Sequence, residues 1–203
     1  MSAIFKKWKF LIIGGVVLVI LTYTLGPIVE FILKVFQRPA YSHTQFYPHW
    51  QRFTNREAGY AVEFPSKPFE YHDSDEIISN LAAISYHQFV SVLESNNCFM
   101  VATLSESFTN DFTDEQINFM LDTSVKGALG SDGRLLAKRN ITLDSNLGRE
   151  IEFQRAGNFL KMRFYKVGHK FQQLTVSVPL ANQQASQSTN ASYFFNSFSL
   201  LPK

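Results

Sequence analysis

The chain has 203 residues, of which 45% are hydrophobic, 15% aromatic and 18% charged, with a formal net charge of +2. This composition excludes a mostly disordered chain, which combines low hydrophobicity with high net charge. The single cysteine excludes an intrachain disulfide framework and a zinc site built from several cysteines. We therefore expect one ordinary domain and an N-terminal segment.

The N-terminal segment is the strongest signal. Residues 10–29 contain no charged side chain, and at about 1.5 Å per residue a helix of this length spans the roughly 30 Å of a bilayer core. Lys6, Lys7 and Lys9 precede the stretch and favour a cytoplasmic N-terminus with the C-terminal domain outside the cytoplasm. We predict that residues 1–38 form a basic cytoplasmic tip, a retained single-pass transmembrane helix and an interfacial helix.

A cleaved signal peptide stays open as the alternative, because a basic start followed by an apolar run is common to both. No cleavage site of small residues follows the run, which favours the anchor. Recovery of a soluble form that starts near residue 27 would identify a signal peptide.

The positive charge is concentrated at the N-terminus. Residues 1–38 carry five Lys or Arg and one Glu, which leaves 14 basic and 16 acidic side chains in residues 39–203. Nucleic-acid binding depends on clustered cations, so this distribution removes its electrostatic basis. We expect the lipid bilayer and a protein as partners, and no nucleic acid.

Residues 39–56 are predicted to be a linker that leads to the domain at 57–203. Two prolines and the lack of apolar periodicity indicate irregular structure. Two interpretations of the linker aromatics stay open. They either anchor at the bilayer surface, or Trp50 and Phe53 pack on the edge of the domain.

Strand patterns begin at the start of the domain. Residues 60–64 alternate and stop at Pro65, which predicts a short first strand. Two apolar runs, 81–93 and 98–104, flank a polar turn and predict a hairpin. The second run does not alternate, so we expect a central strand that is buried on both faces.

A helix is predicted after Thr113. Thr113 and Gln116 have the spacing of a capping box, and Gly127 or Gly130 can end the helix. The predicted buried stripe of this helix is Ile117, Met120, Leu121, Ser124, Val125 and Ala128.

Four more strands are predicted at 134–143, 148–155, 159–167 and 170–178, followed by an amphipathic helix at 193–198. Their short connections require antiparallel neighbours, so the four strands form a meander. The elements together predict an α+β domain. A central antiparallel sheet of about six to seven strands is flanked by helices, and one transmembrane helix precedes it.

The order of these elements resembles the PsbP-like (Mog1/PsbP) superfamily over residues 57–201. The motifs that carry the resemblance are Glu63-Phe64-Pro65 at a strand end, Gly148-Arg149-Glu150 opening a meander strand, and Phe195-Asn196-Ser197-Phe198 ending the last helix. The resemblance implies helices on both faces of the sheet and an accessory, assembly or binding role. The family includes extrinsic photosystem II subunits, from which this chain departs in its predicted anchor. The resemblance supplies no shared catalytic motif.

Motifs for catalysis or metal binding are weak. Residues 71–76 (YHDSDE) hold one imidazole and three carboxylates, but they lack the glycine and spacing of a calcium loop. Cys98 lies among apolar residues, where thiols are inert. No nucleophile elbow or phosphate-binding glycine loop occurs. We predict no catalytic residue, no metal and no cofactor.

A partner surface is predicted on the meander, where alternation places basic residues on strand faces. The residues of this surface are Arg149, Arg155, Lys161, Arg163 and Tyr165. If strand register brings them together, they form a cationic patch for an acidic partner or anionic lipid. The alternative is that Glu150 and Glu152 pair with Lys161 and Arg163 across the hairpin and neutralise the patch.

The function that the sequence favours is a membrane-anchored, non-catalytic binding or assembly module of unknown ligand, displayed outside the cytoplasm. Two other classes stay open. A membrane-tethered hydrolase or metal-dependent enzyme would need a deep pocket that joins His72, Asp75 and another histidine. An accessory subunit of a secretion or envelope complex would show an exposed apolar patch.

Overall fold

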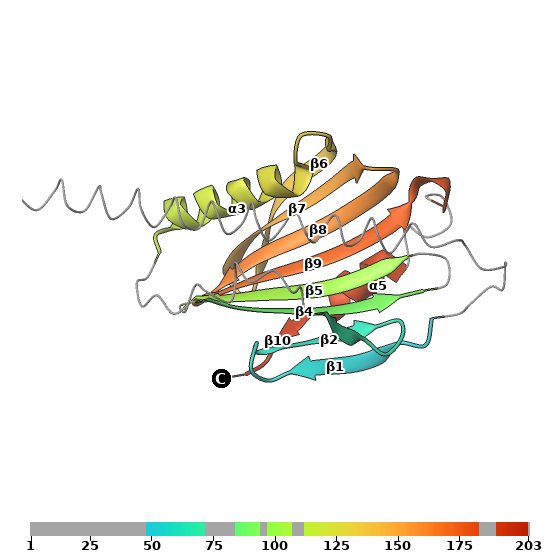
Figure 1. Cartoon of the computed structure of the whole chain (residues 1–203). Coiled ribbons are helices and arrows are strands. Elements are labelled where there is room, and N and C mark those ends of the chain that lie inside the picture. The colour runs from blue at the N-terminus through green and yellow to red at the C-terminus, as the bar shows by residue number, and fades with distance from the viewer. Residues whose placement is uncertain (1–47, 72–83, 94–96, 107–111, 183–189, 203) are drawn as a thin grey trace, which may run out of the picture.

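The computed structural model describes residues 48–71, 84–93, 97–106, 112–182 and 190–202. The strands are β1 (Gln51–Asn55), β2 (Tyr60–Phe64), β3 (Phe69–Tyr71), β4 (Ile84–Val92), β5 (Cys98–Glu106), β6 (Arg134–Leu143), β7 (Asn146–Arg155), β8 (Asn158–Val167), β9 (Lys170–Pro179) and β10 (Ser199–Leu200). The helices are α3 (Asp114–Leu129), the 3-10 turn η1 (Leu180–Asn182) and α5 (Asn190–Ser197). One sheet has seven strands in the order β3-β4-β5-β9-β8-β7-β6, and the other has three in the order β1-β2-β10 (Figure 1).

The predicted hairpin and meander are both confirmed. β4 pairs antiparallel with β5, and β6 to β9 are consecutive antiparallel neighbours. Ala156 and Gly157 connect β7 to β8 with φ of 47° and 79°, as a two-residue turn that matches the strand twist requires. β9 returns beside β5, so residues 98–104 form a buried interior strand of the large sheet.

Helix α3 begins where the sequence predicts. The hydroxyl of Thr113 accepts a hydrogen bond from the Gln116 amide at 3.3 Å, and the Gln116 side chain accepts one from the Thr113 amide at 2.7 Å. The C-cap is Gly130, whose φ of 58° favours glycine. The buried face of α3 packs on β7 and β8 and closes one core of the large sheet (Figure 1).

The capping box gives a first testable prediction. Replacing Thr113 by Ala leaves an amide of the first turn without its acceptor, and we expect the free energy of unfolding to fall by about 1 kcal/mol. Chemical denaturation of the full-length protein measures the change. The control is Thr113→Ser, which keeps the hydroxyl; an equal loss in both variants would contradict a role of the hydroxyl as the cap.

A second core covers the opposite face of the large sheet. Phe194 and Phe195 of α5 are buried there with Phe99 and Val101 of β5. The three-stranded sheet contributes Val62 and its neighbours to the same core. Helices therefore lie on both faces of the large sheet, as the family resemblance implies.

The start of the domain differs from the prediction. Residues 51–55, which the sequence analysis assigns to the linker, form β1 and pair with β2. The ring centroid of Trp50 lies 5.9 Å from that of Phe99, and the ring of Phe53 lies 4.6 Å from that of Phe89. These aromatic contacts fix the segment on the domain. Of the two interpretations of the aromatics, packing on the domain therefore holds for Trp50 and Phe53.

Several predicted features lie outside the described residues. They include the charge-free stretch at 10–29 and the acidic residues at 72–76. Within the described parts of the chain, no helix combines the length and apolar character that crossing a membrane requires. The anchor and its orientation therefore stay predictions.

Candidate functional site

The residues of the predicted partner surface do not share one face of the sheet. In the register between β7 and β8, Arg149 lies opposite Phe164, and Glu150 lies opposite Arg163. Directly opposed residues of antiparallel strands point to the same side. Arg149 and, by alternation, Arg155 therefore point toward α3, whereas Arg163 points to the other side.

The two arginines on the α3 side tie the helix to β7. Arg149 is only 6% exposed, and it donates to the side chains of Asp122 at 3.1 Å and Asn118 at 2.8 Å. Arg155 donates to the Asp132 carboxylate at 2.7 Å. The guanidinium groups of both arginines are thus committed to contacts within the domain.

The basic residues on the other side belong to a group of charges that we call the Glu150 cluster. Its members are Arg139, Glu150, Glu152, Lys161 and Arg163. The Glu150 carboxylate accepts from Arg163 Nε at 2.6 Å, lies 3.1 Å from Lys161 Nζ and also binds Arg139. Lys161 donates to Glu152 at 2.8 Å. Cross-strand pairing, the alternative raised from the sequence, is therefore what the described residues show.

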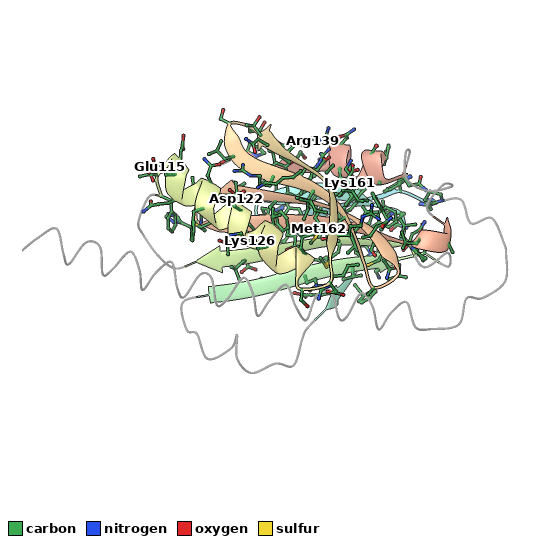
Figure 2. All side chains as sticks on the ribbon, turned by 90° about the horizontal axis from the view of Figure 1, so that it is seen from above. Glu115, Asp122, Lys126, Arg139, Lys161 and Met162 are labelled. Atoms are coloured by element: carbon green, nitrogen blue, oxygen red, sulfur yellow. The ribbon has the colours of Figure 1, made fainter. Side chains whose placement is uncertain are left out.

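Electrostatics hold Glu150 in its charged form. Its side chain is only 2% exposed, and this burial raises the pKa. Hydrogen bonds from Arg163 and Lys161, together with their positive charges, outweigh the burial, and the pKa of Glu150 lies below its ordinary value. The charges of the cluster therefore largely offset one another. Figure 2 labels two of its cations, Arg139 and Lys161, on the strands of the large sheet.

Tyr165 lies in the second core. It is 4% exposed, and its ring stacks on Phe198 with centroids 6.3 Å apart. The ring also covers Gly148, where a Cβ atom would lie 2.6 Å from it. Tyr165 is therefore a packing residue and does not border an exposed patch. Any role of the five predicted residues in binding a partner stays a prediction.

A cavity that the sequence analysis missed lies at one end of the large sheet. Its volume is about 320 Å³. It is formed by the start of α3, the turn between β6 and β7, and the turn between β8 and β9. The lining residues are Phe112, Asp114, Ile117, Ser145, Asn146, Leu147, Lys166, Gly168 and His169. Each turn is visible in the sequence, but only the strand order brings the three segments together.

The distinctive residue of this cavity is Lys166, near the end of β8. It is only 3% exposed, and its ammonium lies 4.9 Å from the centre of the Phe112 ring. A lysine is rarely buried to this extent, and the contact with the ring is a cation–π interaction. The cavity thus combines a buried lysine with a lining of both polar and apolar side chains.

Other reactive groups are dispersed. Among the residues that the structure describes, no three His, Cys, Asp or Glu side chains are close enough to hold a metal ion. Burial raises the pKa of the Cys98 thiol to about 12, so the thiol stays protonated at neutral pH and is a poor nucleophile. His87 contacts Glu70 at 3.0 Å, at the far edge of the sheet from β6.

These features define the class of the domain. A seven-stranded antiparallel sheet carries α3 on one face, and α5 with a small sheet on the other, which is an α+β domain. No family model and no curated protein matches the sequence.

Comparison with solved structures identifies the fold as PsbP-like. The solution structure of cyanobacterial PsbP (CyanoP) from Synechocystis sp. PCC 6803 matches with a TM-score of 0.54 and 12% sequence identity, over 80% of this chain and 98% of that one. Protein PA94 of unknown function from Pseudomonas aeruginosa matches with a TM-score of 0.42 and 14% identity, over 76% of this chain and 98% of that one. The match to CyanoP confirms the fold that the order of elements predicted.

Proposed function

We propose that this chain is a membrane-anchored, non-catalytic binding or assembly module displayed outside the cytoplasm. The observation that carries the proposal is a PsbP-like domain that follows twenty residues without charge. The apolar segment supplies the attachment to the bilayer. The folded domain presents the binding surface to a protein partner.

The charges of the described domain support a protein as the partner. The Glu150 cluster interleaves three cations with two carboxylates on one face of the sheet. Its more exposed members, Arg139 and Glu152, carry opposite charges, and such a mixed surface suits the polar rim of a protein interface. A polyanion such as nucleic acid requires cations that are clustered and unopposed.

Membrane fractionation tests the anchor. We expect the protein to stay in the membrane pellet after a high-salt wash, which releases only proteins held by charge. Val17→Arg combined with Leu18→Arg should move it to the soluble fraction, because each arginine at the centre of a span costs about 2.5 to 3.5 kcal/mol of insertion. The matched control is Val17→Leu with Leu18→Val, which keeps the segment apolar.

Protease treatment of sealed cells tests the side on which the domain lies. We expect the domain to be degraded from the outside and a stoichiometric protein partner to co-purify with the detergent-extracted chain. Release by salt alone, or protection of the domain in sealed cells, would contradict the proposal.

A further inference from the structure

Strand β6 forms one edge of the seven-stranded sheet. Its partner is β7, and no other strand in the part of the chain that the structure describes pairs with it (Figure 1). Residues 134–140 and 142 are exposed, whereas Ile141 and Leu143 are half-buried. The strand at the opposite edge, β3, has three residues, and α3 packs mainly on β7 and β8. β6 is therefore a long edge whose outer side is open among the described residues.

The register with β7 identifies the backbone groups of β6 that point outward. Leu143 and Asn146 flank a two-residue turn with positive φ, and a turn of this kind is closed by a hydrogen-bonded pair. Hydrogen-bonded and non-hydrogen-bonded pairs alternate along antiparallel strands. Counting from the turn, the N–H and C=O groups of Lys138, Asn140 and Thr142 therefore point away from β7.

The open part of the edge is regular. The register shifts between Leu135 and Ala137, and it is unbroken from Ala137 to Leu143. Bulges and prolines are devices by which natural sheets block an edge, but β6 contains no proline and its bulge lies before the unbroken stretch. Pairing with β7 fixes this stretch before a partner arrives, which lowers the entropic cost of binding.

Two arginines lie on one face of this edge. Arg139 is opposite Glu150 of β7 and Arg134 is opposite Gln154, so both arginines point to the face of the Glu150 cluster, away from α3. Arg139 is 63% exposed. Arg134 is exposed as well, and no acidic side chain of the described residues pairs with it. Both guanidinium groups are therefore available to a carboxylate on a neighbouring strand.

The carboxylates of this face do not balance its cations. The Glu150 carboxylate that Arg139 contacts is shared with Lys161 and Arg163. With Arg134 added, the Glu150 cluster combines four cations with two carboxylates. An exposed guanidinium that shares its partner can bind a second carboxylate, because it has five N–H donors. The edge therefore carries a surplus of positive charge.

This surplus favours an acidic strand over a second copy of the chain. The charged side chains of β6 are all positive, so two copies placed edge to edge would bring like charges together, which destabilises neighbouring strands. In an extended segment with acidic residues at alternate positions, all carboxylates lie on one face, where they can meet Arg134 and Arg139. Leu135 and Leu136, 43% and 42% exposed, offer apolar contacts at the end of the same edge.

We propose that the β6 edge binds an extended acidic segment of a partner protein. The segment adds a strand to the large sheet through backbone hydrogen bonds to Lys138, Asn140 and Thr142, and its carboxylates pair with Arg134 and Arg139. The inference rests on the proposed function in treating the chain as a binding module with a protein partner. Membrane fractionation and protease treatment do not depend on this edge. A partner that still co-purifies with a variant blocked at β6 would overturn this inference and leave the proposed function intact.

The probe is a peptide that alternates acidic and uncharged residues, acetyl-TEVEVEVET-amide. Its control, acetyl-TKVKVKVKT-amide, has the same pattern with the opposite charge. Full-length protein in an uncharged detergent is titrated with each peptide and followed by NMR shifts and amide hydrogen exchange. We expect saturable binding of the acidic peptide and slower exchange of the Lys138, Asn140 and Thr142 amides, because they gain hydrogen bonds. The lysine peptide should not bind.

Asn140→Pro tests the backbone contacts. It removes an N–H that points outward, so the ladder with β7 is kept, and proline is tolerated at such edge positions. It should weaken binding of the acidic peptide about tenfold, because one backbone hydrogen bond is lost and the ring obstructs the edge. Asn140→Ala, which keeps the N–H, is the matched control and should bind as the wild type does.

A second variant keeps the test decisive if Asn140→Pro does not fold. Arg134→Gln combined with Arg139→Gln leaves the backbone unchanged and should weaken the acidic peptide about fivefold, the loss expected for two partly exposed ion pairs. The matched control is Arg56→Gln with Lys67→Gln, which removes two exposed cations next to β1 and β2 and should leave the affinity unchanged.

Four results would each overturn the proposal. They are equal binding of the two peptides, unchanged exchange of the outward amides in the presence of the acidic peptide, full affinity in Asn140→Pro, and full affinity in the double arginine variant. Protection of the same amides that rises with protein concentration in the absence of peptide would assign the edge to a second copy of the chain, and it would also overturn the proposal.

Discussion

Val101→Asp is expected to abolish folding of the domain. Val101 is fully buried in β5 and belongs to the second core, which α5 and the three-stranded sheet close. An unpaired carboxylate at this depth costs several kcal/mol, and a domain of this size has only about 5 to 15 kcal/mol of stability in total. We expect loss of the near-UV circular dichroism signal and rapid proteolysis of the full-length protein.

The control at this position is Val101→Ala, which removes two methyl groups without adding charge. It should lower the free energy of unfolding by about 2 kcal/mol through lost packing, and the protein should stay folded. An aspartate variant as protease-resistant as the alanine variant would contradict the placement of β5 inside the large sheet.

Elements with local signals could be predicted from the sequence. The capping box of Thr113 and Gln116 sets the start of α3 because both hydrogen bonds form within four residues. Short polar turns predict the meander because a two-residue connection brings each strand back antiparallel beside the one before it. These patterns depend on neighbours in the chain and need no knowledge of the tertiary structure.

The two short strands β1 and β10 could not be predicted in this way. β10 consists of Ser199 and Leu200, which pair with Ala61 and Tyr60 of β2. These two strands are neighbours in space but lie near opposite ends of the domain sequence. A strand of two residues is too short to show the alternation of apolar and polar side chains by which strands are recognised in a sequence. β1 gains its regular structure from pairing with β2 and from contacts of Phe53 in the core, so tertiary packing decides its conformation.

The separation of the basic residues, in contrast, has a signal in the sequence. The connection between β7 and β8 contains Ala156 and Gly157 and places Arg155 opposite Asn158. Counting back from a two-residue turn places Glu150 opposite Arg163, and so it predicts the neutralised face. The sequence analysis counts Asn158 as part of the connection, and it therefore leaves the register open.

Glu150→Gln is expected to have the second-largest effect. The side chain of Glu150 is 2% exposed and binds three cations. The loss of its charge removes the carboxylate partner of Arg163 and leaves Lys161 with Glu152. Breaking a buried ion pair typically costs about 3 to 5 kcal/mol. We expect a loss of about 3 kcal/mol, at the low end of this range, because Arg139 is 63% exposed and solvated.

The matched control for this variant is Glu152→Gln on the same strand face. The side chain of Glu152 is 34% exposed, and Lys161 is its one ion-pair partner among the residues that the structure describes. The expected loss is therefore below about 1 kcal/mol. Denaturant titration of the full-length protein in an uncharged detergent measures both variants. Equal losses would contradict the central position of Glu150 in the cluster.

The stabilisation that Glu150 contributes is expected to depend on pH, and a comparison of wild type with Glu150→Gln measures this dependence. Hydrogen bonds and charges from Arg163 and Lys161 outweigh the effect of burial and hold the pKa of Glu150 below its ordinary value. A carboxylate with a lowered pKa in the folded state stabilises the fold above its unfolded pKa, about 4.3 for Glu, and this stabilisation is lost as the pH falls through the folded pKa. The difference in unfolding free energy between wild type and Glu150→Gln should therefore be constant from neutral pH to about pH 5 and shrink at lower pH. A difference that is unchanged in acid would mean that the charge of Glu150 does not stabilise the cluster.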